Sequence, residues 1–182
     1  MRYSDTDRIY DELLLTRIQA GDRRAGERLA ARWHPKLMRT AYRLLRDQEQ
    51  ATVAVQEAWT GICKGWLGLR KPSRFPAWAY RILHNKCADQ IRVNQRDREY
   101  ALAETEPTTP PRGEDIVSVD QAFGQLTGEH RAAATLYFSE GLTLAEIAEV
   151  TSVPVGTAKS RIFHARKQLQ AALSDQSETE GE

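Results

Sequence analysis

The chain has 182 residues, a formal net charge of +1 and 41% hydrophobic side chains, which is enough for the core of one domain or two small ones. It contains no apolar run near the roughly 18–20 residues that span a bilayer, and its start lacks the apolar segment of a signal peptide, so we expect a cytoplasmic protein. The near-neutral charge of the whole chain neither indicates nor excludes a nucleic-acid partner.

The first half of the chain has apolar residues at helical spacing, and strand-type alternation is absent. We expect four helices there, over residues 11–20, 23–45, 49–66 and 75–96. The fold class that this pattern predicts is all-α.

A change of composition then divides the chain. Residues 104–115 contain three prolines and cannot bury apolar surface, so we expect a flexible connector. Beyond it, Thr127 can cap a helix that ends near Ser139, and Gly141 fits the position after a helix end. The prediction is two small helical domains joined by a flexible linker. Its boundaries are 10–98 for the first domain, 99–115 for the acidic, proline-rich linker, 116–173 for the second domain and 174–182 for a disordered acidic tail.

Residues 142–161 have the pattern of a helix-turn-helix. Thr143 can cap the first helix, and Glu146 stands three residues later, which is the spacing of a capping box. Pro154 stops this helix, and its fixed φ suits the first turn of the next, which we expect from about Val155 to Leu169. The second helix has an apolar stripe that should pack on its own domain, formed by Val155, Ala158, Ile162, Ala165 and Leu169.

The opposite face of this second helix is basic and polar. Residues 155–170 contain four lysines or arginines and no acid. The side chains on or beside this face are Thr157, Lys159, Ser160, Arg161, Phe163, His164, Arg166 and Lys167. Such a face suits phosphates and base edges in a major groove, and the alternative is an ordinary amphipathic basic helix.

The fourth predicted helix is the second informative stretch. Residues 70–98 contain eight basic residues against two acids, whereas residues 99–120 contain six acids against one arginine. Phe75, Trp78 and Tyr80 lie among basic and amide side chains, a mixture that suits single-stranded DNA, whose bases can stack on aromatic rings. The alternative is that these aromatic residues belong to the core, and for Phe75 we expect the core.

Other chemistry finds little support in the sequence. Cys63 and Cys87 have no metal-ligand spacing, and we expect buried thiols, with a redox pair as the alternative. Serine, histidine and aspartate are present, but we find no nucleophile elbow, phosphate-binding glycine loop or metal-ligand cluster. We therefore predict no enzyme, no catalytic residue, no cofactor and no metal.

Three motifs, in this order, resemble the extracytoplasmic-function (ECF, group 4) sigma factors of bacterial RNA polymerase. VQEAW at residues 55–59 is similar to region 2.2, and residues 75–92, with W-x-Y-R-I-x-x-N, are similar to regions 2.3 and 2.4. LTLAEIAEVTSVPVGTAKSRIFHAR, from residue 142, is similar to region 4.2. The resemblance extends from about residue 11 to residue 173.

The resemblance implies three contact surfaces. The first domain would bind core RNA polymerase at the β′ clamp through Val53, Gln56, Glu57 and Trp59. It would melt and capture the single-stranded −10 element through Trp78, Tyr80, Arg81, His84, Asn85, Lys86 and Arg92. The second domain, which also meets the β flap in the family, would read the duplex −35 element through Thr157, Lys159, Ser160, Arg161, Phe163, His164 and Lys167.

The resemblance also implies a cytoplasmic, nucleoid-associated protein that starts transcription of a stress or envelope-response regulon. A cognate anti-sigma factor, often anchored in the membrane, is a further partner that the family suggests. The sequence departs from the family at Gln50 and Thr52, where acids are common, and at His164, where arginine is frequent. The missing acids keep open a DNA-binding regulator, or a sigma-like protein that no longer drives initiation.

Overall fold

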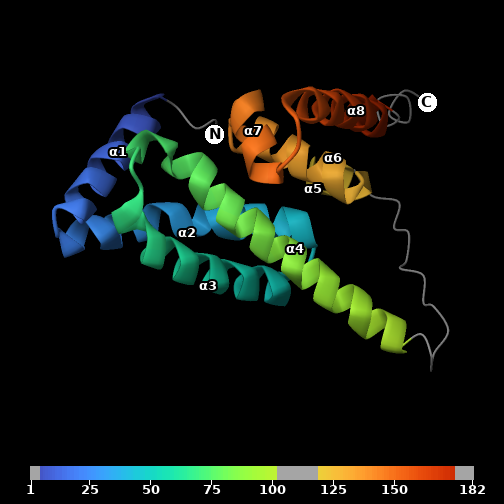
Figure 1. Ribbon diagram of the computed structural model, residues 1–182. Helices are drawn as coiled ribbons and strands as arrows, with labels where there is room; N and C mark the ends of the chain where they lie inside the picture. The colour runs from blue at the N-terminus through green and yellow to red at the C-terminus, as the bar shows by residue number, and fades with distance from the viewer. Residues whose placement is uncertain (1–4, 102–118, 175–182) are drawn as a thin grey trace.

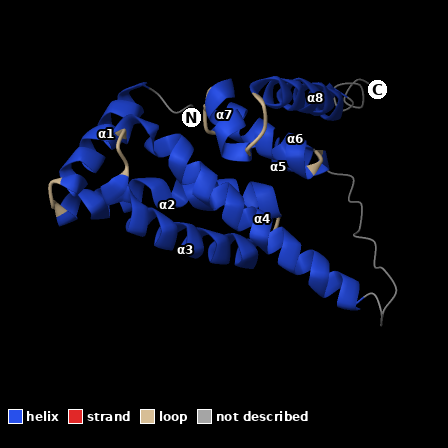
Figure 2. Ribbon diagram, viewed as in Figure 1, coloured by secondary structure: helices blue, strands red, loops and turns tan. Residues whose placement is uncertain are grey.

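The computed structural model describes residues 5–101 and 119–174, and all regular structure in these two ranges is helical (Figure 2). This confirms the predicted all-α class. Most of the predicted linker and almost all of the acidic tail lie outside the described residues. The elements are α1 (Asp5–Gln19), α2 (Arg23–Leu45), α3 (Gln48–Gly65), the short turns η1 (Trp66–Gly68) and η2 (Pro72–Arg74), α4 (Phe75–Ala101), α5 (Val119–Gln125), α6 (Gly128–Ala134), the π-helical turn η3 (Thr135–Ser139), α7 (Leu144–Thr151) and α8 (Val155–Ser174).

Side-chain caps fix where several helices begin. Asp22 accepts the backbone N–H groups of Arg24 and Ala25 at the start of α2. Thr143 and Glu146 form the predicted capping box, in which each side chain accepts the backbone N–H of the other. Because these bonds satisfy donors that have no partner inside the helix, they define helix starts locally.

The first four helices surround a buried tryptophan. Trp33 of α2 is fully buried, and its ring meets those of Phe75 and Tyr80 with centroids 5.0 and 5.3 Å apart. Its indole N–H donates to the buried carboxylate of Asp11 at 2.8 Å, and Arg32 donates to the same carboxylate at 2.9 Å. The Asp11 carboxylate therefore links α1 to α2. Phe75 is a core residue, as predicted.

Two glycines let α3 approach α4 closely. A Cβ on Gly65 would lie 2.7 Å from Cζ2 of Trp78, and one on Gly61 would lie 3.2 Å from Cγ2 of Ile82. The Trp78 ring therefore occupies the space that a side chain at residue 65 would need.

The second domain is built on the apolar face of α8. Ala158, Ile162 and Ala165 are buried, as the stripe predicted, whereas Val155 at the start of the helix is 50% exposed. Leu169, the last residue of the stripe, is half-buried. The chain turns between η3 and α7 at Gly141, whose φ of +67° confirms the expected left-handed position.

The two domains pack against each other, which the sequence did not predict. Figure 1 shows α7 lying beside α4, and a single core cluster contains buried residues of both domains, among them Leu83, Ile147 and Val150. Bonds also cross between the domains: Arg8 of α1 donates to Glu146 of α7 at 2.8 and 3.2 Å, and Arg74 pairs with Glu149. Among the described residues, no helix has the length and apolar character needed to cross a membrane.

Candidate nucleic-acid interface

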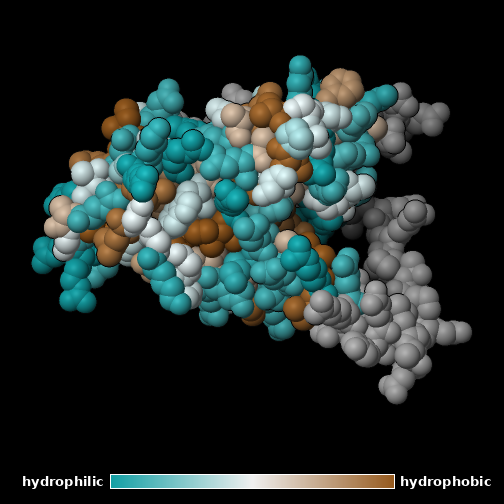
Figure 3. All heavy atoms as spheres, viewed as in Figure 1, coloured by the Kyte–Doolittle hydropathy of each residue, from teal (hydrophilic) through white to brown (hydrophobic). Residues whose placement is uncertain are grey.

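The outer face of α8 is largely exposed. Lys159, Ser160 and Lys167 are exposed, Thr157 is half-buried, and Phe163 is 64% exposed. The Phe163 ring is thus exposed to solvent, beside cationic and hydroxyl groups that can donate hydrogen bonds to phosphates or base edges. Figure 3 shows hydrophilic side chains over most of one face of the molecule, with only small, separate hydrophobic patches.

Two histidines shape the middle of this surface. The imidazole of His164 stacks on that of His130, with centroids 5.9 Å apart and planes 21° from parallel. His130 lies on α6, and its Nδ1 is 3.3 Å from Oε1 of Gln168. The Phe163 ring meets the His164 ring edge-on at 5.5 Å. His164 is therefore oriented by a neighbour from another helix, which no sequence pattern revealed.

Arg161 differs from the other basic residues of α8. Its side chain is only 19% exposed, and it forms an ion pair with Glu129 of α6 at 2.7 Å. It lines the cavity between the two domains rather than the outer face. In the packed arrangement the exposed basic side chains of the helix are thus Lys159, Arg166 and Lys167.

The predicted −10 residues divide between two faces of α4, since successive residues turn by about 100°. Trp78 is half-buried, while Arg81, Asn85 and Arg92 are exposed, and these four share one side of the helix. Arg92 pairs with Asp89 at 3.1 Å. This side remains open to a ligand in the packed arrangement.

The opposite side of α4 faces the second domain. Tyr80 is only 3% exposed, and its hydroxyl donates to the carboxylate of Glu140, which is itself 4% exposed. The same carboxylate accepts a hydrogen bond of 2.9 Å from the Thr40 hydroxyl of α2. Burial and the charge of Glu140 raise the pKa of Tyr80 well above its usual value. Glu140 thus joins α2, α4 and the end of η3, and it was not singled out from the sequence.

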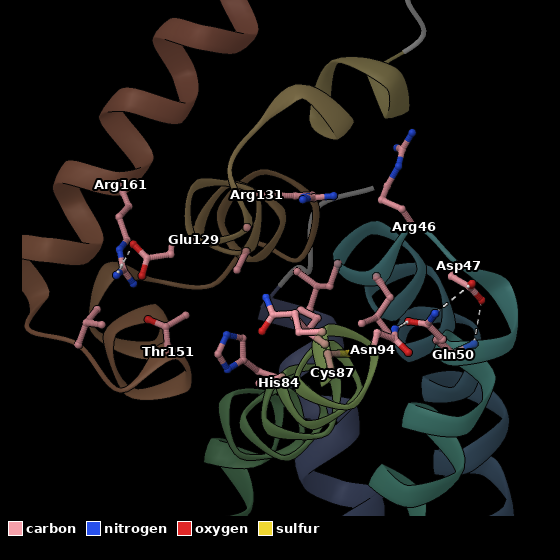
Figure 4. Close-up of a pocket in the computed structure, with 18 residues that line it drawn as sticks. Arg46, Asp47, Gln50, His84, Cys87, Asn94, Glu129, Arg131, Thr151 and Arg161 are labelled. Carbon is pink, nitrogen blue, oxygen red and sulfur yellow. Dashed lines mark hydrogen bonds and ion pairs between the residues drawn. The ribbon is translucent and has the colours of Figure 1, made fainter. Parts of the chain in front are cut away.

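His84 also lies on this inner side and lines the cavity between the domains (Figure 4). Burial lowers its pKa, and the charge of Arg161 lowers it further. Its Nδ1 is buried and has no hydrogen-bond partner. We therefore expect a neutral imidazole near pH 7.

The predicted polymerase-binding residues lie on the outer side of α3. Val53, Gln56 and Glu57 are exposed. Trp59 is half-buried, and its indole N–H donates to Nδ1 of His34 at 3.2 Å. Next to them, Lys86 of α4 lies 3.4 Å from the carboxylate of Glu57, so one predicted DNA residue and one predicted polymerase residue are partners in this arrangement.

Gln50, one of the departures from the family pattern, has a structural role. Its Nε2 donates to Asp47 at 3.1 Å, and its Oε1 accepts from Nδ2 of Asn94 on α4. Asp47 meanwhile caps α3 by accepting the backbone N–H groups of Glu49 and Gln50. An amide at residue 50 can both donate and accept here, whereas a carboxylate would meet the charge of Asp47.

The cysteine prediction is confirmed for one residue and wrong for the other. Cys87 is buried in α4, and this burial raises its pKa to about 12, so its thiol is unreactive while the structure is packed. Cys63 is exposed near the end of α3. In the described part of the chain, no group of three potential metal ligands occurs.

Comparison with known families divides the chain as the structure does. Residues 29–97 match sigma-70 region 2, and residues 116–169 match sigma-70 region 4. The RNA polymerase sigma-H factor of Pseudomonas aeruginosa is 31% identical over 180 residues, which cover 90% of this chain and 93% of that protein. The ECF sigma factor SigM of Mycobacterium tuberculosis is 32% identical over 165 residues, covering 90% and 84% of the two chains.

Two solved structures have a similar fold. One is the sigma factor RpoE of Bartonella quintana in complex with the anti-sigma factor NepR, with a TM-score of 0.69 and 22% identity over 81% of this chain and 96% of that one. The other is CnrH in complex with the cytosolic domain of CnrY, with a TM-score of 0.67 and 24% identity over 91% and 98% of the two chains.

Proposed function

This chain belongs to the ECF-type RNA polymerase sigma factors, and from that membership we propose that it directs the polymerase to the promoters of a stress or envelope-response regulon. Sigma factors bind core RNA polymerase and promoter DNA, and they are not enzymes. The observation that supports the assignment of the DNA-reading surface most strongly is the outer face of α8, where cations and an exposed phenyl ring gather without a single acid between residues 155 and 170.

We propose that α8 enters the major groove of the −35 element. Lys159, Ser160, Phe163 and His164 would face base edges, and Thr157 and Lys167 would contact phosphates. The exposure of the outer face leaves these side chains free to reach DNA. Phosphate contacts would fix the register, while base contacts would carry the sequence information. Arg161 would also contact phosphate, once its ion pair with Glu129 has opened.

For the −10 element, the proposal requires a movement. The open side of α4, with Trp78, Arg81, Asn85 and Arg92, could meet a single strand at once, as could Lys86 beside it. Tyr80 and His84 would reach DNA only after the second domain leaves α4, because Glu140 and the residues around the cavity cover them. We propose that the domains separate when the protein binds polymerase through the outer face of α3.

A cognate anti-sigma factor is the second partner that we propose. One of the two similar solved structures is a complex with an anti-sigma factor, and the other is a complex with the cytosolic domain of CnrY. An anti-sigma factor anchored in the membrane would hold this chain there until it is released.

The first experiment is transcription by sigma-free core polymerase on fragmented genomic DNA of the source organism, with sequencing of RNA 5′ ends. We expect new start sites that share two spaced upstream elements. DNA binding without new starts would contradict a promoter-directing role and favour the DNA-binding regulator, the candidate that the missing acids at Gln50 and Thr52 support. Binding to core polymerase, measured separately, distinguishes the two.

A second experiment tests the roles of individual residues in α8. His164→Arg replaces the stacked imidazole with a group that can pair with guanine in two places, so we expect a changed −35 preference across a promoter library. Lys167→Ala removes a proposed phosphate contact, and we expect binding to fall by about the same factor for every sequence, with a smaller salt dependence. Equal losses for both variants across the library would refute the assignment.

A further inference from the structure

A cavity of about 760 Å³ lies between the two domains (Figure 4). Its walls come from α2, α4 and the start of α3 on one side, and from α6, α7 and α8 on the other. This volume is within the range of roughly 300–1,000 Å³ that is typical of small-molecule sites.

Two residues that line this cavity each have a buried polar atom without a hydrogen-bond partner. The atoms are Nε of Arg131 on α6 and Nδ1 of His84 on α4. A buried polar group without a hydrogen bond costs free energy, and in a native protein it calls for a ligand or an ordered water. Because the two atoms belong to different domains, one ligand that bonds to both would bridge the domains.

The charges around the cavity favour an anion. Among the residues that line it, Arg46, Arg131 and Arg161 are cationic. Of the two acids in the lining, Glu129 pairs with Arg161 and neutralises it, and Asp47 caps α3, so three arginines against two acids leave an excess of one positive charge. Burial lowers the pKa of Arg131, and the charge of Arg46 lowers it further.

The rest of the lining is partly apolar and partly polar. The apolar part includes Leu44, Leu45, Ile91 and Val153, with the small residues Ala88 and Ala132, and the polar part is formed by Gln50, Asn94, Gln95 and Thr151. A hollow that combines apolar side chains with convergent polar groups has the features of a site for a small organic ligand. The guanidinium group of an arginine matches carboxylates and phosphates through paired N–H donors.

We propose that this cavity binds a small organic anion with an apolar group, whose phosphate or carboxylate head is held by Arg131 and His84. Such a ligand contacts both domains, so it stabilises their packed arrangement by mass action. Through the domain movement of the proposed function it would also oppose exposure of Tyr80 and promoter binding. The binding site itself does not depend on that movement.

The test is calorimetric titration of the full chain with hexyl phosphate, inorganic phosphate and hexanol. We expect hexyl phosphate to bind, inorganic phosphate to bind more weakly, and hexanol not to bind. Arg131→Gln should lower the affinity for hexyl phosphate by about tenfold or more, as expected for the loss of one charge-assisted hydrogen bond. Arg28→Gln, at an exposed arginine of α2, removes the same charge and should change nothing.

A second variant keeps the test independent of the folding of Arg131→Gln. Ala88→Leu leaves every charge in place and fills part of the space beside the apolar lining. It should therefore lower the affinity for hexyl phosphate more than the affinity for inorganic phosphate. No binding of hexyl phosphate by the wild type at millimolar concentration, or equal binding by Arg131→Gln, overturns the proposal. Equal affinity for hexyl phosphate and inorganic phosphate overturns the proposal of an organic ligand, because the site would then hold an adventitious ion only.

Discussion

Glu140→Ala should open the two domains. The carboxylate is buried and accepts hydrogen bonds from Thr40 and Tyr80, which belong to the other domain. In the packed arrangement the substitution removes the acceptor of both hydroxyls and leaves them only each other, at a cost of about 1–3 kcal/mol, whereas water satisfies them when the domains are apart. The carboxylate also regains hydration on opening, which offsets part of its contribution.

We therefore expect packing to weaken by about 2 kcal/mol, which corresponds to a roughly thirtyfold larger open population. Cys87 reports that population, because it is buried, lines the cavity between the domains and reacts with a thiol reagent only when it is uncovered. Its labelling rate should rise by about the same factor of thirty as the open population. The exposed Cys63 serves as an internal control, since its rate should not change.

The matched control is Glu27→Ala, which removes an exposed carboxylate from α2. It should leave the Cys87 rate unchanged. If Glu140→Ala also left that rate unchanged, with helical content intact, the interdomain bonds of Glu140 would contribute nothing to packing, and the reasoning would be refuted.

Two other predictions concern helix packing and pH. Gly65→Ala should lower the free energy of unfolding by about 1–3 kcal/mol, since its Cβ would lie 2.7 Å from the Trp78 ring. Gly68→Ala, with open space around it, should change that free energy by no more than about 0.5 kcal/mol. Similar urea midpoints for the two variants would contradict this. The lowered pKa of His84 means that its neutral form is favoured in the packed arrangement, so packing should be fully stable above the ordinary pKa of histidine and weaken as the pH falls below it. Labelling of Cys87 between pH 7 and about 5.5, corrected for the intrinsic pH dependence of thiol reactivity measured on Cys63, tests this, and His84→Gln should remove that part of the pH dependence.

The helices and their ends could be predicted because their causes are local. The capping box of Thr143 and Glu146 and the left-handed Gly141 depend on neighbours within a few residues, so the sequence is sufficient to identify them. The inward stripe of α8 could also be predicted from the sequence, because helical spacing determines which residues share a face.

The contacts that each helix face makes could not be predicted in this way, and they became known only from the fold. The sequence placed Tyr80 and His84 with the other −10 residues, but the second domain covers both of them, and Arg161 turned inward to Glu129. The partner of each of these side chains, Glu140 above all, is distant in the chain.

The residues alone were thus sufficient to predict the all-α class, the helix-turn-helix and the basic outer face of α8. The packing of the two domains, the hydrogen bonds of Glu140 between them and the cavity that remains there became known only from the three-dimensional fold. The physical reason is that spacing along a helix fixes which residues share a face, whereas the contacts of that face depend on the shape and charge of residues far away in the sequence.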